Sequence, residues 1–416
     1  MAAQEKAQTL AGLRSLPRNV WVTTTTSFLT DISSEMIIYL IPLFLANVLG
    51  ASTAIIGLIE GAAEMMSSLL KALSGWLSDR MGNRKRLTVA GYALSALVKP
   101  FLYFSGGWQS VFAVRLADRI GKGIRTAPRD ALIADSIIPQ NRGTAFGLHR
   151  AGDTAGAMIG MMIALLIVLA TQSQSLTLSR ETFQMLVIIA IIPAILGVIV
   201  LAVGVKETQR AAADHRAGRS AIPAFSSDFK FFLGVVFLFA LGNSSDAFLI
   251  LRAQERGLSV AGILGMLISF NLVYAVLSGP LGALSDRIGR RRLIISGWLI
   301  YGVIYLCFAG AMTAAHMWMI YALYGVYYAA VEGTTKALVA DLTLPEQRGT
   351  AYGIYHALIG LAALPASLLA GVLWQGIGEW MGFGPSAPFV AGAMLALTAS
   401  LLLAVRWRGT AQGYLR

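Results

Sequence analysis

The sequence predicts an all-helical membrane protein with twelve transmembrane helices in two pseudo-symmetric six-helix bundles and both termini in the cytoplasm. Two observations lead to this fold class. The 416 residues are 56% hydrophobic and only 13% charged, with a mean hydropathy of +0.68, whereas a soluble domain carries roughly 25% charged residues. The second half of the chain also repeats segments of the first, which indicates a duplicated bundle.

The repeat is clearest in two segments that lie 206 residues apart. Ala131 to Gly147 reads ALIADSIIPQNRGTAFG and Ala337 to Gly353 reads ALVADLTLPEQRGTAYG, with ten identical positions out of seventeen. Upstream, GWLSDRMGNRKR at residues 75–86 returns as GALSDRIGRRR at residues 282–292. This period is far longer than that of solenoid repeats, so it indicates two equivalent halves. In a hydrophobic chain, such halves favour a transporter with its site at their interface.

Apolar segments of about 20 residues, the length that a helix needs to cross a bilayer, recur along the chain. Abundant Gly and Ala and the absence of strand-type alternation favour a helical bundle over a barrel, because small residues let helices pack closely in lipid. The predicted spans of the first half are 20–46, 53–78, 87–105, 108–134, 147–171 and 182–205. Those of the second half are 229–251, 260–285, 292–312, 316–342, 351–376 and 386–406.

The long polar stretch between spans, residues 206–228, divides the chain into an N-terminal bundle at residues 1–205 and a C-terminal bundle at residues 229–416. Its arginines and small residues are typical of an interdomain linker. With the N-terminus inside, 21 of the 33 Lys and Arg residues fall in cytoplasmic loops or tails or at the cytoplasmic ends of spans, and only three fall outside. The net charge of +12 therefore reports topology rather than nucleic-acid binding. It predicts an inner-membrane protein with cytoplasmic termini.

A shared Gly-x-x-x-Asp-Arg-x-Gly pattern contains Gly75, Asp79, Arg80 and Arg84 in the first half and Gly282, Asp286 and Arg287 in the second. The first Gly permits close helix packing, and the Asp can satisfy backbone N–H groups at a neighbouring helix N-terminus. This pattern resembles the signature loop of the major facilitator superfamily, and the resemblance covers the whole chain. It implies a secondary transporter, similar to bacterial efflux members, in which Asp79 and Arg84 help to hold the two halves together on the cytoplasmic side.

Two further patterns are similar to motifs of the same superfamily. The fourth span contains the run RIGKG from Arg119, and the resemblance implies that Arg119 participates in proton coupling. The fifth span carries Gly152, Gly156 and Gly160, which resemble the glycine seam of drug–proton antiporters. The Gly-Pro step of that seam is missing, because Met161 follows Gly160.

The fourth span carries charged residues at spacings of three and four: Arg115, Asp118, Arg119, Lys122, Arg125 and Arg129. At about 100° per residue they share an arc of about 120° on one helix face. Charges in a membrane cost several kcal/mol each unless they face protein or water, so this face is expected to point at the central cavity or at partner helices. We assign Arg115, Lys122 and Arg125 to the binding of an anionic group.

Acidic partners for this face come from the first two spans, where Asp31 and Glu35 share one face of the first and Glu64 lies on the second. Two interpretations remain open: a structural network of ion pairs, or a cavity lining that binds an anion and moves protons. A buried acid beside an arginine can exchange a proton for a salt bridge, as proton coupling requires. We expect Asp31, Glu35 and Glu64, together with Arg119, to carry this coupling.

The spans of the second half are aromatic rather than charged. Their clear interior charges are Asp246, Glu332 and Lys336, whereas nine tyrosines lie in these spans. Most of the tyrosines are expected to pack in the core or at the membrane interface. Tyr324 and Tyr328 lie nearest the helix centres and are, with Glu332, the predicted substrate contacts of this half. Glu332 and Lys336 are one turn apart and are expected to pair.

The leading hypothesis is a secondary transporter that works by alternating access and exports a small organic anionic or amphipathic compound by proton coupling. Import of an anionic metabolite or metal chelate is the alternative, and a non-transporting membrane sensor or scaffold is the alternative of another class. No P-loop, H-E-x-x-H or G-x-S-x-G motif is present, so we expect no enzyme activity, cofactor or metal site. The expected partners are the lipid bilayer, protons and a small-molecule substrate, with no nucleic acid, and we expect a monomer.

Overall fold

The computed structural model describes residues 16–81, 83–137, 142–172, 175–207, 225–343 and 348–408. Within these ranges the regular elements are helices, apart from an isolated bridge between Ile377 and Trp380. Contacts divide the chain into two units. The first takes the described parts of Met1–Ile41, Leu69–Ile167 and Arg180–Arg219, and the second those of Pro42–Ser68, Val168–Ser179 and Ser220–Arg416.

Eight helices in the described part of the chain are long and apolar enough to cross a membrane. They match eight predicted spans and comprise α4 (Thr53–Met81), α7 (Arg142–Gln172), α8 (Arg180–Gly204), α9 with α10 (Ser227–Gly242, Ala247–Glu255), α11 (Val260–Ile288), α12 (Arg290–Gly310), α14 (Arg348–Gln375) and α15 (Ala387–Arg408). The other four predicted spans correspond to shorter or more polar helices: α2 (Arg18–Glu35), α5 (Arg84–Val98), α6 (Trp108–Asp135) and α13 (Ala314–Asp341). The all-helical, multi-pass class is confirmed, whereas twelve crossings stay a prediction.

The predicted first span, residues 20–46, is not one continuous helix. Helix α2 ends at Glu35, and two short elements follow: α3 (Ile41–Leu43) and the π-helical turn η1 (Phe44–Val48). Pro42 explains the interruption, because proline lacks an N–H and its ring clashes with the carbonyl group four residues earlier. Residues 36–40 form turns instead, in which the Leu40 amide donates to the Ile37 carbonyl oxygen at 2.9 Å.

The predicted seventh span, residues 229–251, is interrupted at the equivalent place. Helix α9 ends at Gly242 and α10 begins at Ala247. Ala247 lies 206 residues after Ile41, where α3 begins, and this is the offset of the sequence repeat. The intervening residues are Asn, Ser, Ser and Asp, whose short polar side chains bond to nearby backbone groups and compete with helix. Ser245 shows this competition, because its Oγ accepts a hydrogen bond from the Ala247 amide at 3.2 Å.

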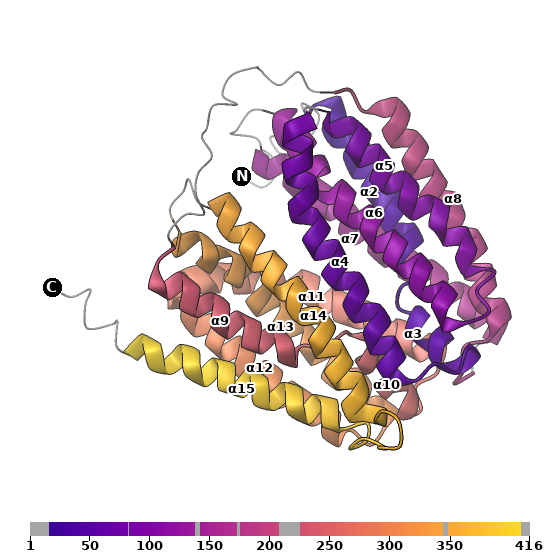
Figure 1. The fold of residues 1–416 in the computed structure, drawn as a ribbon, viewed down its shortest axis with the longest axis vertical. Helices are drawn as coiled ribbons and strands as arrows, with labels where there is room; N and C mark the ends of the chain where they lie inside the picture. The colour runs from indigo at the N-terminus through magenta and orange to yellow at the C-terminus, as the bar shows by residue number, and fades with distance from the viewer. Residues whose placement is uncertain are drawn as a thin grey trace, which may run out of the picture. The chain divides into compact units, whose positions relative to one another are not determined.

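In the first unit, α5 packs along α6 and α2 packs along α8 (Figure 1). The crossing of α5 and α6 depends on glycine, because a β-carbon at Gly91 would lie 2.6 Å from the Gly121 carbonyl oxygen. The predicted glycine seam of α7 packs on α2 in the same way. A β-carbon at Gly160 would lie 2.5 Å from the Ile32 carbonyl oxygen, and one at Gly156 would clash with the carbonyl oxygen of Phe28. Small residues thus bring these backbones together, as they do in lipid-embedded bundles.

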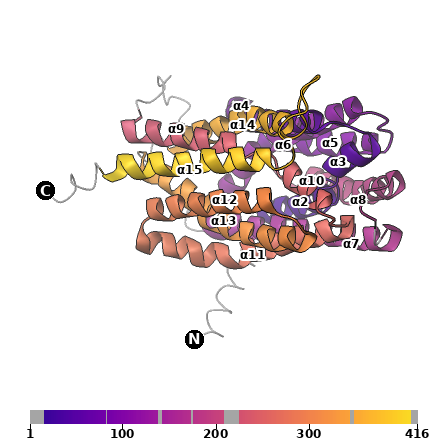
Figure 2. The same cartoon turned by 90° about the horizontal axis from the view of Figure 1, so that it is seen from below.

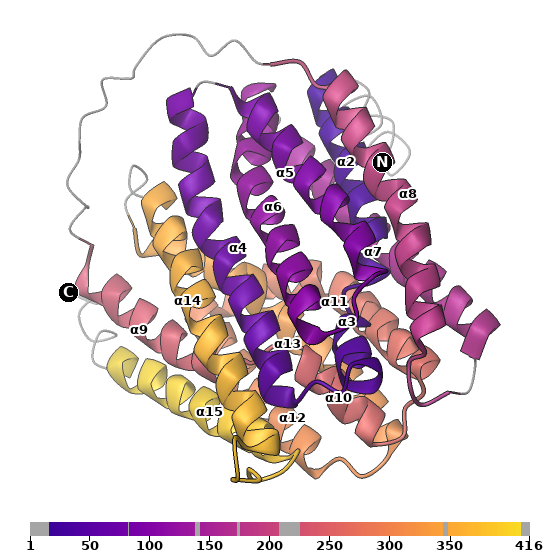
Figure 3. The ribbon, with the colours of Figure 1, turned by 45° about the vertical axis from the view of Figure 1, so that its right-hand side comes forward.

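In the second unit, α15 lies between α9 and α12 (Figure 2), and α13 packs on both α11 and α12. Large aromatic side chains fill its core, among them Phe239, Trp298, Tyr301, Tyr305, Tyr321, Tyr324 and Phe308. The first part of α4, residues 53–68, runs along α14 within this unit (Figure 3). Thr53 Oγ1 donates to the Gly371 carbonyl oxygen at 2.9 Å, which fixes the register of these two helices.

Candidate functional site

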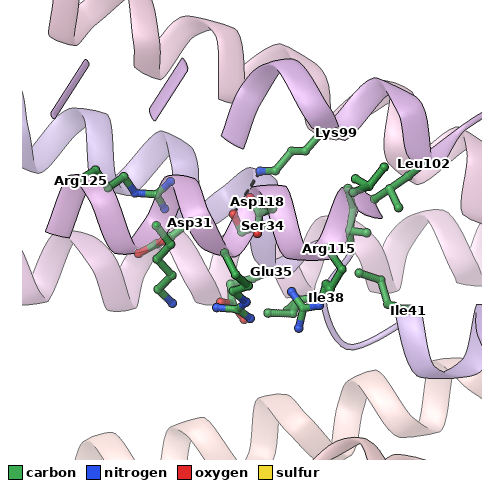
Figure 4. Close-up of a pocket in the computed structure, with 14 residues that line it drawn as sticks. Asp31, Ser34, Glu35, Ile38, Ile41, Lys99, Leu102, Arg115, Asp118 and Arg125 are labelled. Atoms are coloured by element: carbon green, nitrogen blue, oxygen red, sulfur yellow. Dashed lines mark hydrogen bonds between the residues drawn. The ribbon is translucent and has the colours of Figure 1, made fainter. Parts of the chain in front are cut away.

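A pocket in the first unit collects most of the charged side chains predicted to line a cavity (Figure 4). It lies among α2, α6 and the end of α5, where the 3₁₀ turn η2 (Lys99–Leu102) follows, and it has about 590 Å³ of empty space, part of it open to solvent. Its charged walls hold five bases and three acids: Lys99, Arg115, Arg119, Lys122, Arg125, Asp31, Glu35 and Asp118. Six of these eight are predicted site residues, and the other two are Lys99 and Asp118.

The cations of α6 enter the pocket from one helix face, as their spacing predicts. Arg115, Arg119 and Arg125 are all at least nine-tenths buried. Arg125 is held in place, since its Nη1 donates to Ser95 Oγ at 2.7 Å and its guanidinium lies 4.3 Å from the centre of the Tyr92 ring. The buried Nε of Arg119 has no hydrogen-bond partner among the residues that the structure describes. This N–H is therefore available to a ligand.

Lys99 is a pocket residue that the sequence-based assignment of the site omits. It lies at the end of α5, is 4% exposed, and its Nζ donates to Ser33 Oγ at 2.6 Å and to Ser34 Oγ at 3.1 Å. Two signals could have identified it: a lysine inside an apolar span, and Pro100 directly after it, which ends the regular helix at that point. Lys99 also lies within electrostatic range of Asp118 on α6.

The acids of α2 face the cations of α6. Asp31 and Glu35, one turn apart, both line the pocket. Asp31 lies within electrostatic range of Lys122 and Arg125, and Glu35 within range of Lys122 and Arg119. Each acid therefore has cationic neighbours and also lines the pocket. There a proton can bind to the acid, and an anionic ligand can bind to the cations in its place.

Glu64, the third predicted proton-coupling acid, does not line this pocket. It is exposed on the part of α4 that belongs to the second unit. Helical periodicity places Glu64 on a face of its span, but it does not tell which neighbours that face has.

The predicted contacts of the second half lie in the second unit, and they separate into two settings. Tyr328 and Glu332 line a pocket that has about 600 Å³ of empty space, part of it open to solvent, together with Phe239, Asn243, Trp298, Tyr327, Thr335 and Tyr355. Glu332 pairs with Lys336 at 3.0 Å, as expected, and also accepts a hydrogen bond from the Tyr274 hydroxyl at 2.7 Å. Tyr324 does not line this pocket. It is fully buried within the aromatic core, where its ring stacks on that of Tyr327.

The repeated loop residues form an equivalent ion pair in each unit. Arg84 Nη1 lies 2.6 Å from Asp135 Oδ2 in the first, and Arg290 Nη1 lies 2.6 Å from Asp341 Oδ2 in the second. These two aspartates are not among the predicted site residues, although both belong to the repeated ALIAD and ALVAD segments.

The other predicted gating residues are only partly described. Gly75 packs towards α6, where a β-carbon would lie 3.3 Å from that of Ala127, and Arg287 is exposed. The side chains of Asp79, Arg80 and Asp286 and the surroundings of Gly282 lie outside the described residues.

Comparisons with known proteins bear on the whole chain. The family model "Major Facilitator Superfamily" matches residues 23–270 and 231–413. An uncharacterized MFS-type transporter of Methanocaldococcus jannaschii is 37% identical over 390 residues, which cover 92% of this chain and 94% of that protein. The multi-drug resistance efflux pump PmrA of Streptococcus pneumoniae is 24% identical over 331 residues, which cover 76% of this chain and 79% of the pump.

Solved structures show the same fold. The crystal structure of a D-xylose–proton symporter matches with a TM-score of 0.74 at 16% sequence identity, over 93% of this chain and 96% of the symporter. The family match extends through both halves of the sequence and agrees with the all-helical architecture. The chain therefore belongs to the Major Facilitator Superfamily and is a multi-pass membrane transporter rather than an enzyme.

Proposed function

We propose that this transporter works by alternating access and exports a small organic anionic or amphipathic compound by proton coupling across the inner membrane, with both termini in the cytoplasm. The observation that carries the proposal is the pocket of the first unit, whose walls hold five bases and three acids. With every group ionised, the walls carry two more positive than negative charges. Such an excess is costly in a membrane protein unless a ligand or water compensates it.

The geometry of the arginines supports an anionic ligand. Guanidinium groups bind carboxylates and phosphates through parallel charge-assisted hydrogen bonds, which are about twice as strong as neutral ones. Arg125 is oriented by Ser95 and Tyr92, and the buried Nε of Arg119 is left without a hydrogen bond among the described residues. A carboxylate or phosphate at this wall would satisfy that N–H and neutralise the excess charge. We assign the binding of the anion to Arg115, Lys122 and Arg125, with Arg119, the predicted proton-coupling arginine, contributing its Nε–H.

The acids of α2 support proton coupling. Asp31 and Glu35 share the same cationic neighbours as the proposed anion site. The bases can pair either with these acids or with a bound anion, so the charge state of the two acids depends on whether the anion is bound. Proton and substrate occupancy are thereby linked through Arg119 and Lys122.

The second pocket is proposed as a separate apolar subsite. Aromatic side chains occupy much of its wall, and Glu332 is neutralised there by Lys336. Tyr328 is the best placed predicted contact, whereas a role for Tyr324 and for Glu64 in transport stays a prediction. We further propose that the Gly75–Arg84 and Gly282–Arg287 segments control the alternation between states. The similarity to the pneumococcal efflux pump favours export over import.

The test begins with an untargeted comparison of metabolites inside and outside cells with and without the gene. Compounds that accumulate inside the deletion strain are then measured for flux in proteoliposomes under an imposed pH gradient. We expect an anionic compound whose flux responds to the gradient and is lost in Arg125→Gln. Lys230→Gln is the matched control, because Lys230 is exposed and lines neither pocket. A cationic substrate, or flux indifferent to the gradient, would contradict the proposal.

A further inference from the structure

A buried histidine and an aspartate near the start of α7 lie outside the pocket walls. His149 is only 4% exposed, and its Nε2 lies 3.7 Å from Asp153 Oδ1, one turn later on the same helix. In the described part of the chain, neither ring nitrogen of His149 nor Asp153 Oδ1 makes a hydrogen bond. Buried polar atoms are nearly always paired in native proteins, so this pair calls for an explanation.

Charged residues of both α6 and α7 lie near this pair. Arg129 and Asp130 of α6 and Arg150 and Asp153 of α7 lie within electrostatic range of His149. Arg129 is itself occupied, since its Nε donates to Asp130 Oδ1 at 2.9 Å and its Nη1 to Ser27 Oγ at 3.2 Å. The imidazole therefore stands between fixed charges of both signs, and Asp153 is the acid nearest to it.

The glycine seam connects the pair to the pocket. Gly152 lies directly before Asp153 and Gly156 lies three residues after it. These two glycines let α7 pack closely against Thr24 and Phe28 of α2. Asp153 thereby faces the turn of α2 that leads to Asp31, and the two carboxyl groups lie within electrostatic range of each other. Asp31 in turn lines the charged pocket. Ionisable groups thus run from the start of α7 through Asp153 to the pocket wall.

We propose that His149 and Asp153 form a proton-binding pair that supplies protons to Asp31, an inference that rests on the proton-coupled function proposed above. Protonated His149 gives up the proton on Nε2 to the Asp153 carboxylate, so that an N–H bond breaks, an O–H bond forms and both groups become neutral. The Asp153 proton then passes to the Asp31 carboxylate. A distance of 3.7 Å is just beyond hydrogen-bond length, and a small rotation of the ring closes it.

Histidine suits this role because an imidazole with its ordinary pKa changes charge between about pH 5 and 8. A purely structural histidine on a helix face normally donates one ring N–H to a neighbouring acceptor. His149 lacks that bond while an unsatisfied carboxylate oxygen lies 3.7 Å away. This geometry favours a histidine that gains and loses a proton over a histidine with a purely structural role.

The test uses the full-length protein with ring-¹⁵N-labelled histidine, whose protonation NMR reports directly. The chain has only four histidines, so loss of one signal in His149→Gln assigns that residue. His316 is exposed and provides the internal reference. We expect His149 to titrate, and we expect Asp153→Asn to move its midpoint to lower pH by about one unit or more, because the neighbouring carboxylate stabilises the imidazolium. Asp31→Asn should cause a smaller shift, since it acts through Asp153.

A His149 signal that does not change between pH 5 and 8, or a midpoint that neither substitution moves, would overturn the pair without touching the charged pocket. A coupled titration accompanied by flux that ignores a pH gradient would instead refute proton-driven transport. The pair would then remain a proton site, and its role as a supplier to the transport step would be overturned.

Discussion

Helices α6 and α13 occupy equivalent positions in the two halves, and their comparison shows where the duplicated halves diverged. Both have 28 residues, and both end on an aspartate that pairs at 2.6 Å with an arginine at the start of the preceding helix, α5 or α12. Between those shared ends, α6 turns three buried arginines towards a pocket, whereas α13 turns tyrosines into an aromatic core. The shared ends serve packing, and we place the substrate chemistry in the charged interior.

The largest effect is expected from removing one buried cation of α6. Arg119→Gln should abolish transport while leaving membrane insertion and the elution profile in detergent intact, because the lost interaction is with the ligand. Losing a hydrogen bond to a charged group corresponds to about tenfold or more in binding. The measurement is flux of the identified substrate in proteoliposomes. Undiminished flux in Arg119→Gln would remove α6 from the binding site.

The matching change in α13 should act on stability. Tyr324 is fully buried among aromatic rings, so Tyr324→Ala leaves a cavity and should lower the free energy of unfolding by about 3–5 kcal/mol. Thermal unfolding in detergent measures the loss. Tyr324→Phe keeps the ring and is the control, with a change expected to be below about 1.5 kcal/mol. If Tyr324→Phe eliminates transport at full stability, then α13 also carries substrate chemistry.

The twin ion pairs allow a finer comparison of the two halves. The Arg84 side chain is 9% exposed and that of Arg290 is 30% exposed, although both pairs have the same length. Breaking a buried pair costs more than breaking an exposed one, so Arg84→Gln should cost about 2 kcal/mol of stability and Arg290→Gln less than about 1 kcal/mol. If the two substitutions lower stability equally in thermal unfolding, the difference in burial does not affect what each ion pair contributes.

The smallest expected effect concerns the seam between α7 and α2. Gly156→Ala would place a methyl group against the Phe28 carbonyl oxygen, and we expect this overpacking to cost about 1 kcal/mol. Gly234→Ala is the control, because open space surrounds that position in α9 and alanine favours helix over glycine. A stabilised Gly156→Ala protein would show that α7 does not require glycine to reach α2.

Much of the architecture follows from the sequence, because apolar length and the internal repeat depend on local residues alone. The face formed by Arg115, Arg119, Lys122 and Arg125 is predictable for the same reason, since helical spacing sets it and the cost of charge in lipid requires it to point inwards. The pairing of Glu332 with Lys336 needs only one turn of helix. These features do not depend on which helices become neighbours.

Other features depend on packing between segments that are distant in the sequence. The interruption at residues 243–246 is held partly by a distant helix, because the Ser245 amide donates to Ser367 Oγ on α14. Lys99 is held at the pocket because Ser33 and Ser34 of α2 accept hydrogen bonds from its Nζ. Tyr324 lies inside an aromatic core rather than at a cavity wall because of the rings that surround it. Periodicity gives a residue a face but does not identify the neighbours of that face.

The most direct test of the central claim compares wild type, Arg125→Gln and Lys230→Gln in the same proteoliposome flux assay, with and without a pH gradient. We predict that the gradient accelerates flux of an anionic substrate in wild type and in Lys230→Gln, and that Arg125→Gln loses flux in both conditions. Wild-type flux by Arg125→Gln would contradict the assignment of the charged pocket to substrate binding.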